Sequence, residues 1–177
     1  MQQKKDADLI SRIIVYDDHR AFQQLIERYQ KEVRNLLLKL TGFNEQEVDD
    51  LAQETFIRVY KYLKTYKANA GFSTWLYRIA YNVYLEAQRK QAKKQSVESE
   101  SALTSNYNPE AQLNSKMDAK TVLKVLKPEE QVAIQLAYIE GMSHADIAKV
   151  LDCPLGTVKT HIKRGKERIR KYLNVAK

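Results

Sequence analysis

The sequence predicts an all-α protein made of two small helical domains joined by a flexible linker. Glycine and proline are scarce, with five and three among 177 residues, and hydrophobic residues make up 44% of the chain. Apolar residues recur at helical spacing through most of it, among many Leu, Ala, Lys, Gln and Glu, which favour helices. Residues 93–115 are rich in Ser, Asn, Gln and Glu without that periodicity, which is typical of a linker. We therefore expect an N-terminal domain at residues 1–92 and a C-terminal domain at residues 116–177.

Three long helices are predicted in the N-terminal domain. The first carries apolar residues between positions 22 and 40 and ends at Thr41-Gly42. The second spans about 45–64, and the third begins with Ser73 as its N-cap. The expected core face of the third helix consists of Trp75, Leu76, Ile79, Ala80 and Val83.

The C-terminal domain is expected to end in a helix-turn-helix at residues 143–173. A helix initiated by Pro128 comes first, and then a short apolar segment that breaks at Asp152-Cys153-Pro154. The next helix has an apolar stripe that includes Val158 and Ile162, while its other faces are basic. Two helices, a tight turn and a basic second helix are the requirements of a motif that reads the DNA major groove. An amphipathic hairpin with a solvated basic face is the less favoured interpretation.

Charge and composition narrow the possible functions. The formal net charge is +8 at pH 7, which favours a polyanionic partner such as nucleic acid. We find no apolar run long enough to cross a bilayer and no signal peptide, so we expect a cytoplasmic protein without membrane insertion. A single cysteine, Cys153, and three scattered histidines give no metal-ligand spacing, and we expect neither a metal nor a cofactor.

The third helix interleaves aromatic rings with polar and cationic groups. Off its expected core face it carries Tyr77, Arg78, Tyr81, Asn82, Tyr84, Arg89 and Lys90. Unpaired bases stack on such rings while cations follow the phosphate backbone, so this helix is a candidate for single-stranded DNA. The alternative, equally weighted on spacing alone, is that these aromatic residues complete a small hydrophobic core.

The second helix carries an acidic and polar strip opposite its core face, which includes Asp49, Asp50, Gln53, Glu54 and Ile57. In a basic protein, this strip with its exposed isoleucine suggests a protein partner, although a solvated helix face explains it too. The paired carboxylates lack a histidine partner, a glycine-rich loop or a nucleophile elbow, so we do not expect an enzyme.

Three segments of the chain form an ordered set of motifs: DLAQETFIRVY from Asp50, FSTWLYRIAYN from Phe72 and LGTVKTHIKRG from Leu155. In this order they resemble the extracytoplasmic-function (ECF) sigma factors of bacterial RNA polymerase. The resemblance implies that the first domain binds core polymerase and melts the promoter −10 element, and that the second reads the −35 element. It also implies an anti-sigma factor as a partner.

The resemblance assigns candidate residues to each task. Asp50, Gln53 and Glu54, with Ile57, match the polymerase-binding strip, and residues 66–73 match the loop that captures an extruded −10 base. The −10 candidates are Tyr66, Phe72, Tyr77, Arg78, Tyr81, Asn82 and Arg89. The −35 candidates are Thr157, Lys159, Thr160, His161, Lys163, Arg164, Lys166 and Arg168. The chain departs from the family after Asn82, where it has Glu86-Ala87-Gln88-Arg89.

Two other functions remain to be distinguished. A dimeric helix-turn-helix regulator would bind duplex DNA without core polymerase and would need a sensor or dimerising domain at its N-terminus. The sequence has no α/β pattern of the phosphoacceptor type there, which argues against this alternative. A helical adaptor that binds only proteins is the second alternative, and the basic recognition helix argues against it.

Overall fold

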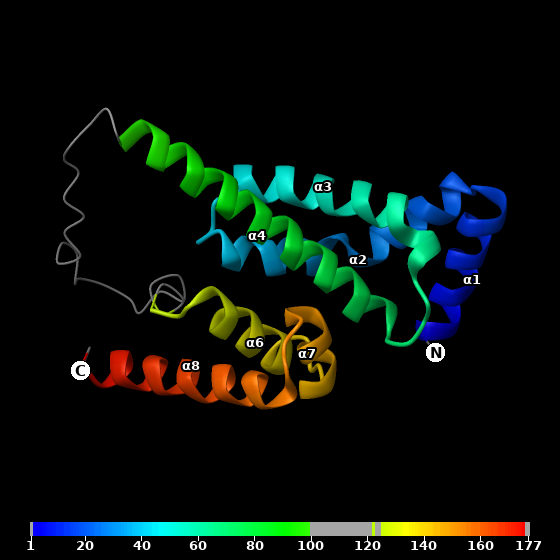
Figure 1. Cartoon of the computed structure of the whole chain (residues 1–177). Helices are drawn as coiled ribbons and strands as arrows, with labels where there is room; N and C mark the ends of the chain where they lie inside the picture. Colours follow the sequence, from blue (N-terminus) through cyan, green and yellow to red (C-terminus); the bar gives the residue numbers. More distant parts are fainter. Residues whose placement is uncertain (1, 100–121, 123–124, 176–177) are drawn as a thin grey trace.

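The computed structural model describes residues 2–99, 122 and 125–175, and within these ranges every regular element is helical (Figure 1). The N-terminal elements are α1 (Gln2–Tyr16), α2 (His19–Leu40), α3 (Glu45–Tyr62), the short 3₁₀ helix η1 (Leu63–Thr65) and α4 (Phe72–Ser99). The C-terminal elements are α6 (Pro128–Tyr138), α7 (His144–Leu151) and α8 (Leu155–Val175). The all-α fold expected from the sequence is therefore confirmed.

Side-chain caps explain where α2 and α3 begin. Asp18 accepts a hydrogen bond from the backbone N–H of Ala21 at 3.0 Å, and Asn44 accepts one from Glu47 at 3.3 Å. The bond from Ala21, together with that from Arg12 of α1 at 2.6 Å, holds the pKa of Asp18 below its ordinary value. The cap thus fixes both the start of α2 and the α1–α2 corner.

Helix α1 was not expected from the sequence. Its Leu9, Ile10 and Ile13 are buried against the rest of the N-terminal helices. Asp6 is also buried, where it accepts a hydrogen bond from the Tyr29 hydroxyl at 2.7 Å and pairs with Arg28 of α2. The buried carboxylate is thereby satisfied, and α1 is anchored by polar as well as apolar contacts.

Two predicted boundaries differ from those of the structure. Helix α4 begins at Phe72, so Ser73 lies inside it and is not its N-cap. The same helix continues to Ser99, past the predicted start of the linker at residue 93. The rest of the predicted linker, residues 100–115, lies outside the described residues.

The helix-turn-helix geometry is confirmed. Ser143 caps α7 by accepting the backbone N–H of Asp146 at 3.1 Å, and Asp152 ends α7 in the left-handed region with φ 52°. The N–H of Cys153 donates to the Ala148 carbonyl at 3.1 Å, which closes the turn before α8 begins. Val158 is fully buried, as expected for the residue that fastens α8 onto α7.

The two ends of the chain share one continuous core. Helix α4 packs on α3 and α2 along one side and on α7 along another, while α2 also contacts α6 (Figure 1). Because α4 is covered from two directions, little of its first half remains open to solvent. This double covering buries much of the α4 face that the sequence predicted to bind DNA.

Candidate functional site

The aromatic face of α4 is largely buried. Tyr77 and Tyr81 are 3% and 4% exposed, and Phe72 is 3% exposed, so their expected display on an open surface is wrong for this arrangement. Trp75, expected in the core, is only half-buried. The sequence could not predict the burial of Tyr77 and Tyr81 because the second layer that covers α4 comes from α7, far along the chain.

Polar contacts join α4 to the C-terminal helices. The Tyr77 hydroxyl donates to Glu140 Oε2 at 2.9 Å, and Arg78 pairs with Asp152 at 3.2 Å. Burial, and then the negative charge of Glu140, raises the pKa of Tyr77 well above its ordinary value, so this residue remains a neutral donor. Burial likewise raises the pKa of Tyr81.

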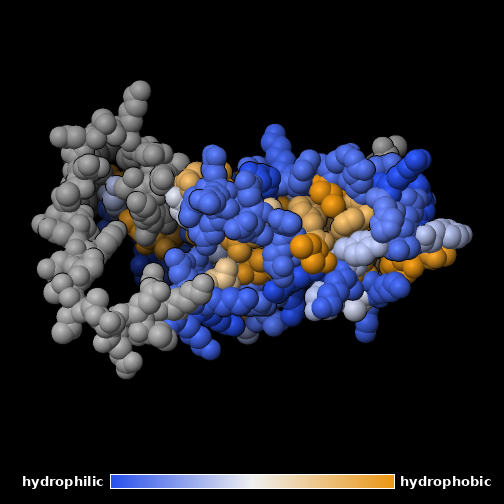
Figure 2. Space-filling view, turned by 90° about the horizontal axis from the view of Figure 1, so that it is seen from above, coloured by the Kyte–Doolittle hydropathy of each residue, from blue (hydrophilic) through white to orange (hydrophobic). Residues whose placement is uncertain are grey.

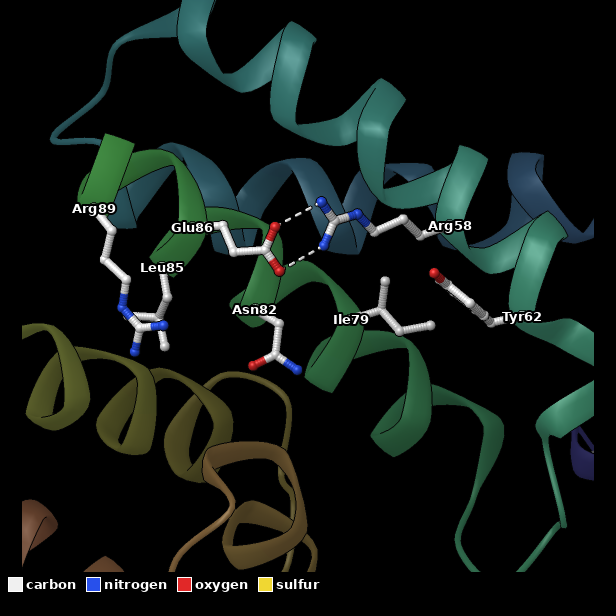
Figure 3. A pocket seen from close by; sticks show the side chains of 7 residues that line it. All are labelled: Arg58, Tyr62, Ile79, Asn82, Leu85, Glu86 and Arg89. Atoms are coloured by element: carbon white, nitrogen blue, oxygen red, sulfur yellow. Dashed lines mark hydrogen bonds and ion pairs between the residues drawn. The ribbon is translucent and has the colours of Figure 1, made fainter. Parts of the chain in front are cut away.

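Asn82, Arg89 and Arg78 are the −10 candidates on α4 that remain exposed. Of these three, Arg78 is the one that pairs with a residue of the C-terminal helix-turn-helix, Asp152. Asn82 and Arg89 are therefore the more accessible candidates. Asn82 and Arg89 line a pocket of about 250 Å³, whose other lining residues are Arg58, Tyr62, Ile79, Leu85 and Glu86. Figure 3 shows these side chains gathered along α4 beside the end of α3. An amide and a guanidinium at the edge of such a hollow could hydrogen-bond a base and a phosphate.

A charged network that sequence reasoning missed forms one wall of this pocket. Arg58 donates to both oxygens of Glu86, at 2.8 and 2.7 Å (Figure 3). It also donates to Glu54 at 2.6 Å. This bond with Arg58 is the largest reason that the pKa of Glu86 is lowered. The departure from the family pattern at Glu86 was the only signal, and it did not identify a partner 28 positions away.

The loop between η1 and α4 borders a second hollow, of about 370 Å³. Its lining includes Tyr66 and residues 68–71 from the loop, Phe72 at the start of α4, and Asp6, Ala7 and Ile10 from α1. The Tyr66 hydroxyl donates to the Ala70 carbonyl at 2.8 Å, which holds the loop in a closed turn. Tyr66 packs edge-on against buried Phe72, with ring centroids 5.6 Å apart. Sequence reasoning identified the loop but not the α1 wall.

The acidic strip on α3 is accessible. Asp50 and Gln53 are exposed, Ile57 is 53% exposed, and Glu54 is half-buried beside Arg58. Seen from above α3 and α4, the surface is mostly hydrophilic but has apolar side chains near its middle (Figure 2). The structure therefore brings the four polymerase-binding candidates together on one open face.

Helix α8 presents its basic face to solvent. Thr157 and His161 are half-buried, whereas the remaining −35 candidates, Lys159, Thr160, Lys163, Arg164, Lys166 and Arg168, are exposed. The Thr160 hydroxyl donates to the Gly156 carbonyl at 2.9 Å. The amino-terminal half of α8 is thus free to enter a major groove.

Two of these basic residues also have partners within the C-terminal domain. Arg168 Nε lies 3.2 Å from Glu130 Oε2, and Glu130 is only 1% exposed. The Lys166 ammonium lies 4.5 Å from the centre of the Tyr138 ring. Both residues, which the sequence suggested only as −35 DNA contacts, therefore also make contacts within the protein.

Replacing Arg168 is expected to destabilise the protein as well as weaken DNA binding. Arg168→Ala leaves the buried Glu130 carboxylate without its guanidinium partner, and we expect a loss of about 1–2 kcal/mol of unfolding free energy, because Arg168 is partly solvated. Lys166→Ala is the comparison and should cost less. Urea unfolding of both variants tests this, and equal stabilities would contradict a structural role for the Arg168–Glu130 pair.

The described residues contain no group of three or more His, Cys, Asp or Glu side chains that could hold a metal ion. Among the helices of the same described residues, none is long and apolar enough to span a membrane.

Comparison with known proteins identifies both halves of the chain. Residues 25–94 match the model of sigma-70 region 2, and residues 116–169 match that of sigma-70 region 4. The ECF RNA polymerase sigma-E factor of Haemophilus influenzae is 34% identical over 184 residues, covering 95% of each chain. The RNA polymerase sigma-H factor of Pseudomonas aeruginosa is 34% identical over 187 residues, covering 98% of this chain and 96% of its own.

Solved structures show the same fold. The sigma factor RpoE of Bartonella quintana, in complex with the anti-sigma factor NepR, superposes with a TM-score of 0.70 at 21% identity, over 88% of this chain and 98% of that chain. CnrH, in complex with the cytosolic domain of CnrY, gives a TM-score of 0.68 at 22% identity, over 98% and 97% of the two chains.

Proposed function

The chain belongs to the ECF sigma factors of bacterial RNA polymerase, and we infer from this that it binds core polymerase and directs it to promoters. The observation that carries this inference is the match of two sigma-70 regions, in order, within a chain that aligns to ECF relatives over 95% of its length. Its work is recognition and DNA opening, with no catalysis of its own, and it takes place in the cytoplasm, where promoters and polymerase are found.

The acidic strip on α3 is the proposed polymerase contact. Asp50, Gln53 and Ile57 form an exposed polar and apolar face, as a protein interface requires, and Glu54 extends it. A negative strip on a chain of net charge +8 also keeps this face away from DNA.

Single-stranded −10 DNA is proposed to bind along α4 and its preceding loop. Asn82 and Arg89 offer an amide and a cation beside one hollow, and Tyr66 borders the other, which is large enough for a base. Extruding a base costs a few kcal/mol, and stacking and hydrogen bonds within a pocket offset that cost. Tyr77 and Tyr81 could join this surface only after α7 moves away.

The exposed amino-terminal half of α8 is the proposed reader of the −35 element. Thr157, Lys159, Thr160 and Lys163 are placed to meet base edges, while the basic residues that follow anchor to phosphates. Linking the two DNA-binding parts raises the effective concentration of the second contact. By analogy with the RpoE–NepR complex, we also expect an anti-sigma partner.

Run-off transcription tests the function directly. Core polymerase that receives this protein should initiate from a subset of a genomic promoter library, and core polymerase alone should not. A dimeric regulator would instead bind duplex DNA without forming a complex with core polymerase, and gel filtration of the mixture separates the two. Absence of both the complex and promoter-specific transcripts would reject the sigma-factor function.

Asn82→Ala is expected to impair promoter opening selectively. The side chain is exposed and makes no hydrogen bond to another described residue, so its loss should leave the fold, −35 binding and polymerase binding intact. Loss of one base contact should reduce open complexes by roughly 5- to 100-fold. Permanganate reactivity of unpaired thymines measures this effect, and wild-type reactivity in the variant would remove Asn82 from the proposed site.

A further inference from the structure

A carboxylate lies in the middle of the strand-binding row proposed for α4. Asn82, Glu86 and Arg89 are spaced by four and three residues, so they follow one another along one face of the helix, and all three line the same pocket. The side chain of Glu86 is 44% exposed. An uncompensated carboxylate repels a polyanionic strand. If a strand binds here, Glu86 must therefore be neutralised or must face a hydrogen-bond donor.

Arg58 of α3 supplies the neutralising charge. Its guanidinium donates to both oxygens of Glu86, at 2.8 and 2.7 Å, and Figure 3 shows the Glu86 carboxylate turned toward it above Asn82. Two parallel bonds from a planar guanidinium fix the orientation of a carboxylate as well as balancing its charge. Arg58 therefore acts on the pocket through Glu86.

The paired carboxylate keeps capacity to accept further hydrogen bonds. Each carboxylate oxygen has two lone-pair sites, and the bidentate pair with Arg58 uses one on each oxygen. Because this pairing lowers the pKa of Glu86, the side chain stays ionised and can only accept. An N–H of an unpaired base satisfies such an oxygen, whereas a base carbonyl or a phosphate oxygen is repelled by it.

The bases differ in the group that they would present to this carboxylate. Adenine and cytosine carry an exocyclic amino group where thymine carries a carbonyl oxygen. The other lining residues suit a base of any kind: Tyr62 offers a ring that is 45% exposed, and Ile79 and Leu85 add half-buried apolar surface. Selectivity among bases in this pocket therefore depends on its polar groups.

We propose that Glu86, neutralised and oriented by Arg58, makes the −10 site selective for an unpaired base with an exocyclic amino group, adenine or cytosine, and against thymine. The proposal rests on the proposed sigma-factor function and adds a chemical basis for base choice on α4. Glu86 is the specificity-determining residue and Arg58 the positioning residue. Arg89, which is not needed to balance Glu86, remains available for a phosphate.

Base preference is measured with the holoenzyme and a pool of non-template strands randomised across the −10 region. Sequencing of the bound strands gives the preference at each position, and fluorescence anisotropy of single strands gives the affinity. The holoenzyme is used because Glu54, the second carboxylate that Arg58 contacts, belongs to the proposed polymerase contact.

Three variants separate the two roles: Glu86→Gln, Arg58→Met and the double variant. Glu86→Gln keeps the shape of the side chain but removes its charge and adds a donor. The matched controls, Glu27→Gln and Arg20→Met, make the same changes of charge at exposed positions of α2 and should behave as wild type.

Wild type should prefer adenine or cytosine over thymine at one position of the strand. Glu86→Gln should reduce that preference by about tenfold, because an amide can donate to thymine as well as accept from adenine or cytosine. Preferences at the other positions should not change. This variant alters a partly exposed side chain without changing its volume, so the test does not depend on a variant that unfolds.

Arg58→Met should weaken binding of every strand, by about tenfold at low salt, because it leaves Glu86 as an uncompensated charge in the pocket. The double variant should regain the affinity of Glu86→Gln but not the base preference of wild type. A pair that only ties α3 to α4 would give no such rescue, since the double variant lacks both partners.

Two results would overturn the proposal. Identical base preferences of wild type and Glu86→Gln at every position would mean that this carboxylate reads no base. A double variant that binds strands no better than Arg58→Met would mean that Arg58 does not act by neutralising Glu86. Promoter-specific transcripts from the wild-type holoenzyme would in both cases keep the sigma-factor function, whereas absence of the holoenzyme would reject that function itself.

Discussion

Removing the polar side chains of the acidic strip should largely abolish holoenzyme formation. The triple variant Asp50→Ala/Gln53→Ala/Glu54→Ala is expected to weaken binding to core polymerase by about 10- to 1,000-fold, since a few side chains carry most of the energy of an interface. The fold should survive because Asp50 and Gln53 are exposed. Glu54→Ala removes one partner of Arg58, but Arg58 keeps both bonds to Glu86.

A control on a neighbouring helix separates this effect from general loss of surface polarity. Gln23→Ala/Gln24→Ala/Glu27→Ala changes three exposed side chains of α2, two of which bond only to one another, and should leave polymerase affinity unchanged. Fluorescence anisotropy with labelled protein gives the two dissociation constants. Equal affinities of a folded strip variant and wild type would place the polymerase contact elsewhere on the molecule.

Phe72→Ala should cause the largest loss of stability among the candidate residues. Phe72 is 3% exposed and lies among the rings of Tyr29, Tyr66 and Trp75, with centroids 5.3, 5.6 and 5.7 Å away. Truncating a buried phenylalanine costs about 3–5 kcal/mol. Trp75→Ala should cost less because Trp75, which the sequence placed on the core face, is only half-buried.

Urea unfolding followed by circular dichroism gives both free energies under the same conditions. Phe72→Leu is the milder comparison: it keeps most of the buried volume and should lose clearly less stability than Phe72→Ala. A larger loss of stability in Trp75→Ala than in Phe72→Ala would contradict the structure, in which Phe72 is the more deeply buried ring. Phe72 also borders the loop hollow. If Phe72→Ala binds −10 DNA less tightly, the stability measurement therefore shows whether the variant has lost a DNA contact or is partly unfolded.

The sequence alone determined the elements whose signals are local. Apolar periodicity located the main helices, Thr41-Gly42 marked the end of α2, and Pro128 marked the start of α6. The turn at Asp152-Cys153-Pro154 located the helix-turn-helix, since capping and left-handed turn residues act within a few positions. The exposed strip on α3 and the basic face of α8 also followed from helical spacing.

Only the tertiary structure decided what depends on partners far along the chain. Burial of Tyr77 and Tyr81 depends on the packing of α7 on α4, and one wall of the loop hollow comes from α1. The partners of Glu86 and Arg168, which are Arg58 and Glu130, also lie far from them in the sequence. Helical spacing gives the direction of a side chain about its own axis, but not how many neighbours cover that helix. For α4, a helix covered from two directions, the sequence therefore predicted the chemistry of the face, and packing alone determined that it is closed.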